Sequence, residues 1–145
     1  MSVTVSGTNN VKKWEKEFGE AIERALFRVG LEAEGNAKDR ITKNKSVDTG
    51  LLRNSITFAV SGGKANAPKY RATKPDKKGV YRFGRYEGTA PEEKNKAVYI
   101  GTNVEYGAYV ELGSRGRDGK PFLKPAATEH REEYKRIFED EMKGR

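Results

Sequence analysis

Few residues of this chain have types and spacings that could do chemistry, and the first is a carboxylate. Asp48-Thr49-Gly50 matches the tripeptide that carries the catalytic aspartate of aspartic proteases. In those enzymes two carboxylates share one proton, so a chain of this length would have to dimerise. The context disagrees, because polar residues precede Asp48 where an apolar strand is required. A short helix over Leu51–Asn54, capped by Asp48 or Thr49, explains the same residues better.

The glycine-rich loops and the single histidine offer no better catalytic site. Gly62-Gly63-Lys64 lacks the leading glycine and the Ser/Thr of a P-loop, and Gly119-Lys120 is followed by Pro121, which has no backbone N–H. His130 is the only histidine and there is no cysteine, which excludes thiolate metal sites and cysteine nucleophiles. We therefore expect no enzyme, no catalytic or metal-binding residue, no cofactor and no small-molecule substrate.

Positive charge is the strongest signal in the composition. The chain has 29 Lys and Arg against 21 Asp and Glu, a net charge of +8. Between Gly62 and Arg85 only Asp76 is acidic, while eight residues are basic: Lys64, Lys69, Arg71, Lys74, Lys77, Lys78, Arg82 and Arg85. Aromatic residues interleave with these cations, a pattern that holds single-stranded nucleic acid, but alternating aromatics also form one face of a strand. Two interpretations stay open, contact with DNA and a basic hairpin that packs on a neighbouring protein, and we favour the second.

The elements that would position these residues predict an α+β fold in a single domain, 1–145. Apolar residues recur at spacings of three and four from about Val11 to Ile41, which predicts a long N-terminal helix after an N-terminal arm, 1–9. A C-terminal helix is expected from about Pro125 to Met142. Both would pack on a small antiparallel sheet with strands near 55–60, 80–83 and 97–102. Residues 61–96 are expected to form an extended basic hairpin or loop insertion.

The long helix and the lean composition both point to assembly with other subunits. The helix would be about 45 Å long, more than a small domain can cover. Only 34% of the residues are hydrophobic and 34% are charged, which favours burial completed by neighbours. Phe27 and Leu31 lie off the main apolar stripe, while Gly30 and Gly35 mark a bend or a close approach. No apolar run is long enough for a membrane span or a signal peptide.

The segment after the last expected strand looks architectural. We expect Tyr106, Tyr109 and Leu112 to clamp the sheet against its surroundings. Gly113–Gly119 is interpreted as a flexible joint, and Pro121–Pro125 as a rigid elbow that aims the last helix, with Phe122 as its main anchor.

Three segments together resemble the small neck and tail-completion proteins of long-tailed bacteriophages, also described as head–tail joining or minor tail components. Val47–Ile56 is similar to the family's V-D-T-G-x-L-R-x-S-I signature, and Val98–Asn103 together with Tyr106–Gly113 to its Y-A-x-x-V-E-F-G element. Pro121–Ala126 is similar to its P-F-L-x-P-A entry to the final helix. The chain departs from the family where Leu112 replaces the usual aromatic residue and where the basic insertion is long.

The resemblance implies a non-enzymatic virion protein of α+β fold, made in the host cytoplasm and placed at the head–tail junction or the top of the tail tube. Its partners would be copies of itself in a ring around the DNA path, other neck and tail proteins, and genomic DNA. The alternative is a stand-alone nucleic-acid-binding protein that uses residues 64–86. The residues expected to serve packing or assembly are Trp14, Phe18, Asp48, Thr49, Gly50, Arg53, Tyr106, Tyr109, Glu111, Pro121, Phe122 and Pro125.

Overall fold

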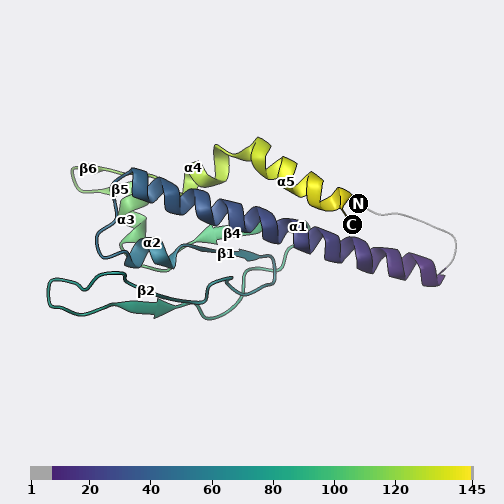
Figure 1. Cartoon of the computed structure of the whole chain (residues 1–145), viewed down its shortest axis with the longest axis horizontal. Coiled ribbons are helices and arrows are strands. Elements are labelled where there is room, and N and C mark those ends of the chain that lie inside the picture. Colours follow the sequence, from purple (N-terminus) through teal and green to yellow (C-terminus); the bar gives the residue numbers. More distant parts are fainter. Residues whose placement is uncertain (1–7, 145) are drawn as a thin grey trace.

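One long helix forms the spine of the molecule. The computed structural model describes residues 8–144, with side chains from Glu15 onward. Helix α1 (Thr8–Lys43) runs the length of the molecule, and the C-terminal helix α5 (Arg131–Lys143) lies along it (Figure 1). The expected α+β fold is confirmed. The other elements are α2 (Leu51–Ser55), β1 (Thr57–Val60), β2 (Lys69–Arg71), β3 (Phe83–Arg85), β4 (Val98–Gly101), α3 (Gly107–Leu112), β5 (Gly113–Ser114), β6 (Arg117–Asp118) and α4 (Leu123–Thr128).

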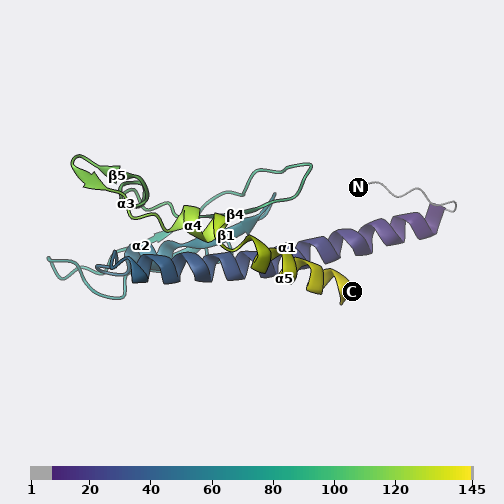
Figure 2. The ribbon, with the colours of Figure 1, turned by 90° about the horizontal axis from the view of Figure 1, so that it is seen from above.

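Helix α1 buries small side chains, which allow other elements to approach closely. Its buried apolar residues are Ala21, Ala25, Ala33, Ala37 and Ile41. The first turns of α1 extend beyond the other helices and strands, as Figures 1 and 2 both show. Among the described residues, no helix combines the length and the apolar character needed to cross a membrane. The predicted arm was drawn too long, because residues 8 and 9 are already helical, and its first seven residues lie outside the described part.

A glycine in α1 makes room for the main aromatic residue of the core. Gly30 is buried, and a Cβ there would lie 2.2 Å from Cδ2 of Phe58 in β1. The Phe58 side chain is only 2% exposed, and Phe27 meets its ring edge-on at a centroid distance of 5.1 Å. The prediction for Gly30 and Gly35 is a bend or the approach of another backbone; instead a side chain approaches Gly30, and a Cβ at Gly35 would meet nothing within 4 Å.

The strands form three separate antiparallel pairs rather than one sheet. Strands β1 and β4 pair with Phe58 opposite Ile100, β2 pairs with β3, and β5 pairs with β6. The predicted strand at 80–83 is thus wrong both in its limits and in its partner. It could not join β1, because the loop after β1 returns to that edge: the Asn66 N–H donates to the carbonyl of Phe58 at 2.8 Å.

The predicted C-terminal helix is broken in two. Helix α4 ends where the Glu129 N–H donates to the carbonyl of Pro125, and the backbone of His130 is non-helical (φ −121°, ψ 25°) before α5 begins. The break allows α4 to bury Ala126 in the core while α5 turns to run along α1. Tyr134 spans the break, since its hydroxyl donates to the carbonyl of Ala126 and accepts from Asn36 of α1.

Substitutions at two glycines of α1 should have opposite effects. We expect Gly30→Ala to lower the free energy of unfolding by about 1–3 kcal/mol, because the methyl group overlaps the Phe58 ring. Gly35→Ala should raise it by about 0.5–1 kcal/mol, because the space at Gly35 is open and alanine favours the helix. Urea denaturation followed by circular dichroism measures both, and equal effects at the two sites would contradict the Phe58 contact.

Candidate assembly surfaces

A single carboxylate joins two of the segments that carry the sequence resemblance. Glu111, in α3, accepts hydrogen bonds from the backbone N–H groups of Phe122 (2.9 Å), Leu123 (2.8 Å) and Lys124 (3.1 Å). The first N–H groups of a helix have no partner within the helix, and a negative charge at that end is favourable. Glu111 thus caps α4 from another part of the chain and fixes the elbow at Pro121. The Phe122 side chain is fully buried, which is the position that an anchor of the elbow requires.

The loop between the two segments is a pinned hairpin, so the prediction of a flexible joint at Gly113–Gly119 is wrong. Gly113 has φ +88°, and a Cβ on Gly119 would lie 2.6 Å from the carbonyl oxygen of Glu111. Only glycines allow backbones this close. The Lys120 N–H donates to the carbonyl of Val110 at 2.7 Å, and the side chain of Asn44 donates to the carbonyls of Lys120 and Pro121.

The Val47–Ile56 segment connects α1 to the basic insertion. Gly50 is buried at φ +86°, and a Cβ there would lie 2.9 Å from Oγ1 of Thr73. The carbonyl of Thr49 accepts hydrogen bonds from the N–H groups of Thr73 (2.8 Å) and Lys74 (3.0 Å), and the Thr49 hydroxyl caps α2 by accepting from the Leu51 N–H at 3.3 Å. Gly50 and Thr49 therefore hold the insertion against α2.

Two further residues of this segment have different positions. Arg53 is half-buried and donates from Nε to the hydroxyl of Thr42 at 3.1 Å, which ties α2 to α1. Asp48 is exposed in a loop that follows the end of α1. It does not follow a buried strand, as the aspartate of an aspartic protease must, and the capped turn is the interpretation that the structure supports.

The basic insertion contains a β-hairpin, which we call the basic ribbon (residues 69–85). The ribbon consists of β2, a tip and β3, and Figure 1 shows that it runs below β1 and β4 along one side of the molecule. The expected basic hairpin is therefore present. Asn54 of α2 fixes it through donors to the carbonyl of Arg71 (2.8 Å) and the hydroxyl of Thr73 (3.0 Å).

A cluster of polar side chains locks the inward face of the ribbon. The hydroxyl of Tyr70 donates to Oδ1 of Asn103 at 2.6 Å, and the amide of Asn103 donates to the carbonyl of Arg85 at 2.9 Å. Tyr86 donates to the carbonyl of Ser55 at 2.8 Å and accepts from the N–H of Asn103 at 3.0 Å. Burial raises the pKa of the Tyr70 and Tyr86 phenols above the ordinary value. Both phenols therefore stay neutral donors at physiological pH.

The tip of the ribbon is built around Asp76, its one acidic residue. The carboxylate accepts from the N–H groups of Val80 (3.0 Å) and Lys78 (2.9 Å) and from Nε of Arg82 (2.9 Å). These donors, the Val80 N–H above all, hold the Asp76 pKa below its ordinary value. All eight of the predicted contact cations are exposed: Lys64, Lys69, Arg71, Lys74, Lys77, Lys78, Arg82 and Arg85.

Helix α3 presents Tyr109 and Leu112 to solvent, so these two predicted clamp residues do not pack within this chain. The side chains of Tyr109 and Leu112 are 64% and 81% exposed, and Tyr106 is 42% exposed. The reason is the shortness of α3, which turns Gly107 and Val110 inward and its larger residues outward. These residues remain candidates for contact with other subunits rather than for packing within this one.

The remaining predicted residues are divided between core and surface. Pro125 is buried in the core with Phe122, while Pro121 is exposed and Phe18 is half-buried. The side chain of Trp14 lies outside the described residues. Sequence reasoning missed the three asparagines that tie the segments together: Asn44, Asn54 and Asn103. The available signal was that two of them lie inside the matching segments, since Asn54 follows Leu52-Arg53 and Asn103 follows Gly101-Thr102.

Short motifs thus cap, pin and space the helices, while the cations of the basic ribbon and the large side chains of α3 are exposed. Within residues 8–144, no group of three or more His, Asp or Glu side chains is placed to hold a metal ion. A family model of bacteriophage HK97-gp10-like tail components matches residues 8–113, well over half of the chain. The chain belongs to this family. No curated protein and no solved structure matches this chain.

The Glu111 cap should contribute strongly to stability. Glu111→Ala leaves three backbone N–H groups at the elbow without their acceptor, and we expect it to lower the free energy of unfolding by about 1–3 kcal/mol. Glu111→Gln, which keeps one acceptor oxygen, should cost less. Glu105→Ala removes an exposed carboxylate and is the control, with an expected change within about 0.5 kcal/mol. A Glu111→Ala variant as stable as the control would show that the cap is not required.

Substitution of Phe122 in the elbow can be compared with the same substitution at Phe83, which is exposed in β3. Phe122→Ala should lower the free energy of unfolding by about 3–5 kcal/mol, because the Phe122 side chain is 0% exposed in the core. Phe83→Ala should change it little, because Phe83 is 83% exposed. Thermal denaturation of both variants compares them directly, and normal folding and assembly of Phe122→Ala would refute the elbow as an anchor.

Proposed function

We propose that this tail component acts at the head–tail junction or the top of the tail tube, where copies of it form a ring around the DNA path and complete the neck or tail. Family membership places the protein among structural components of the phage virion and implies contact with other phage structural proteins. The observation that supports a ring most directly is the incomplete burial of the spine helix. A helix that extends past its own domain is stabilised when a neighbouring subunit covers it.

The exposed surfaces suit a head-to-tail arrangement of subunits. The first turns of α1 and the exposed residues of α3 lie at opposite ends of the molecule (Figures 1 and 2). Phe27 and Leu31 of α1 are 44% and 45% exposed and add apolar surface between these ends. When different surfaces of each subunit meet, the contacts are heterologous, and they close into a ring if the rotation between subunits permits. A two-fold dimer would instead bring identical surfaces together.

A stand-alone nucleic-acid-binding role is the second candidate, and the exposed cations of the basic ribbon favour it. It predicts a protein that acts without joining the particle. The two roles differ in what happens to virions when the protein is missing.

Disruption of the gene in its phage tests the proposed role. We expect lysates to contain DNA-filled heads and separate tails, because the junction lacks the subunit that completes it. Electron microscopy counts the joined particles, and addition of purified protein should restore joining and infectivity. Phe122→Ala protein, whose elbow is unanchored, is the negative control. Normal numbers of joined, infectious particles without the protein would refute the role.

A further inference from the structure

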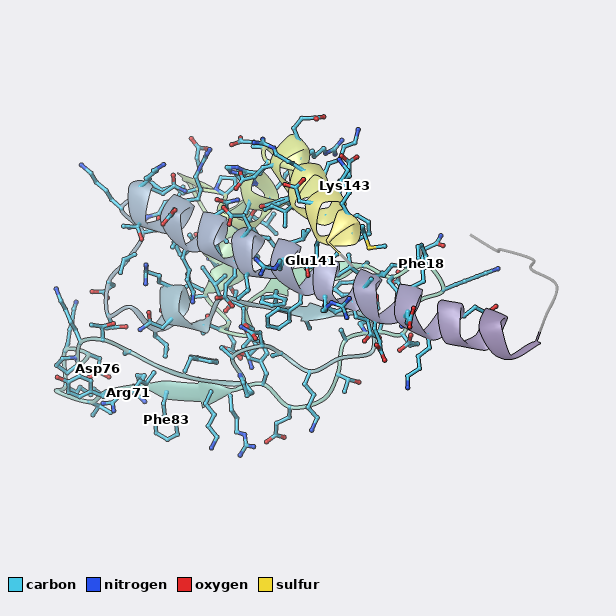
Figure 3. All side chains as sticks on the ribbon, turned by 45° about the vertical axis from the view of Figure 1, so that its right-hand side comes forward. Phe18, Arg71, Asp76, Phe83, Glu141 and Lys143 are labelled. Carbon is cyan, nitrogen blue, oxygen red and sulfur yellow. The ribbon has the colours of Figure 1, made fainter. Side chains whose placement is uncertain are left out.

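The two faces of the basic ribbon differ in composition. Antiparallel pairing places Lys69 opposite Arg85 and Arg71 opposite Phe83, so these four side chains share one face. All four are exposed, whereas the opposite face carries Tyr70 and Gly84, and a Cβ on Gly84 would overlap the Tyr70 hydroxyl. Phe83 points away from the body of the molecule (Figure 3). The outward face is therefore three cations around one exposed aromatic ring.

The positive charge of the whole chain is concentrated in the segment Gly62–Arg85, which contains the basic ribbon. The segment from Gly62 to Arg85 carries a net charge of +7 out of +8 for the chain, so the rest of the protein is nearly neutral. Lys69 and Arg85 are like charges directly opposite each other, an arrangement that costs stability on its own. Arg82 pairs with Asp76 and Arg85 with Glu87. Within the described part of the chain, the lysines of the ribbon have no ion-pair partner: Lys69, Lys74, Lys77 and Lys78.

The kind of cation and its distribution favour a linear polyanion over an acidic protein. Protein interfaces are enriched in arginine and depleted in lysine, yet five of the eight basic residues in the segment Gly62–Arg85 are lysines. They are spread from the strands to the tip, along about 25 Å of extended chain, rather than gathered at one spot. A row of exposed lysines suits evenly spaced phosphates, and a two-stranded ribbon fits the major groove of duplex DNA.

We propose that the basic ribbon binds the phosphate backbone of duplex DNA with its outward face and tip. Lys69, Arg71 and Arg85 contact phosphates, and Phe83 lies between them against the wall of the groove. The binding is independent of sequence, because phosphate contacts carry no base information. This inference deepens the proposed function and rests on it for the source of the DNA, the genome that passes through the tail.

The ribbon meets DNA as a preformed element. Asn54, Asn103 and Tyr86 hold its base, and Asp76 organises its tip, so the cations are presented without the cost of ordering a free loop. Arg71 lies over the ring of Tyr81, with its Cζ 5.5 Å from the ring centroid, which limits the mobility of that guanidinium group. On the outward face, Lys69 has no ion-pair partner among the described residues, while the Arg85–Glu87 pair is exposed and DNA would displace it.

A salt titration with matched triple variants tests the inference. The probe is a fluorescent 30-base-pair duplex of random sequence, and anisotropy gives the dissociation constant between 50 and 200 mM NaCl. The ribbon triple is Lys69→Gln, Lys74→Gln and Lys77→Gln. The control triple, Lys16→Gln, Lys124→Gln and Lys135→Gln, removes the same charge from exposed lysines elsewhere. Each lost phosphate contact should reduce the slope of log K against log salt by about 0.9, so the ribbon triple should lose about 2.7 and the control triple little.

The outcomes separate DNA from other partners. Absence of duplex binding by the unaltered protein at 50 mM NaCl, or equal slopes for the two triples, overturns the inference. Equal affinity for polyglutamate matched in charge also overturns it, because the ribbon would then serve an acidic protein surface. The anisotropy assay uses purified protein alone. If it shows no DNA binding, but added protein restores head–tail joining to phage without the gene, the result contradicts DNA contact only. If phage without the gene still joins heads to tails, and the purified protein nevertheless binds DNA, the result contradicts the proposed role only.

Discussion

The arrangement of this chain depends on the carboxylate of Glu111 and the helix end that it caps. Residues 107–112 form a helix of only six residues, too short to be stable alone. The carboxylate nevertheless receives three backbone N–H groups from the start of α4, and this fixes the direction in which the chain enters its last two helices. Phe122 and Ala126 then reach the core beside α1, and α5 can lie along the spine. Two distant motifs are in this way one structural unit.

The spine itself is adapted to close packing. Alanines on α1 and the absence of a side chain at Gly30 allow β1 to approach until the Phe58 ring touches the helix backbone. Because this core is narrow, many large apolar residues have no place in it. The same sequence that makes α1 a close-packed spine therefore leaves apolar side chains of α1 and α3 exposed.

The parts of the fold that follow from local rules could be predicted from the sequence. Helix α1 follows from its apolar spacing, and the burial of Phe122 from the prolines that flank it. The length of the basic insertion indicates a hairpin or an extended loop. The break at His130 could not be predicted, because it depends on the different directions in which α4 and α5 find partners. The pairing of β3 with β2 depends on hydrogen bonds from Asn54 and Asn103, which are distant in sequence. The exposure of Tyr109 and Leu112 could not be predicted either, because large apolar residues are usually buried.

We propose that neighbouring copies complete this tail component and that its positive charge is directed at DNA. A cryo-electron microscopy reconstruction of the neck and upper tail of the phage would test both proposals. We expect a ring of this chain at the head–tail junction or the top of the tail tube. We also expect that the first turns of α1 are covered by the adjacent copy and that the basic ribbon faces the DNA channel. A position elsewhere in the virion, or a ribbon directed away from the DNA, would contradict these proposals.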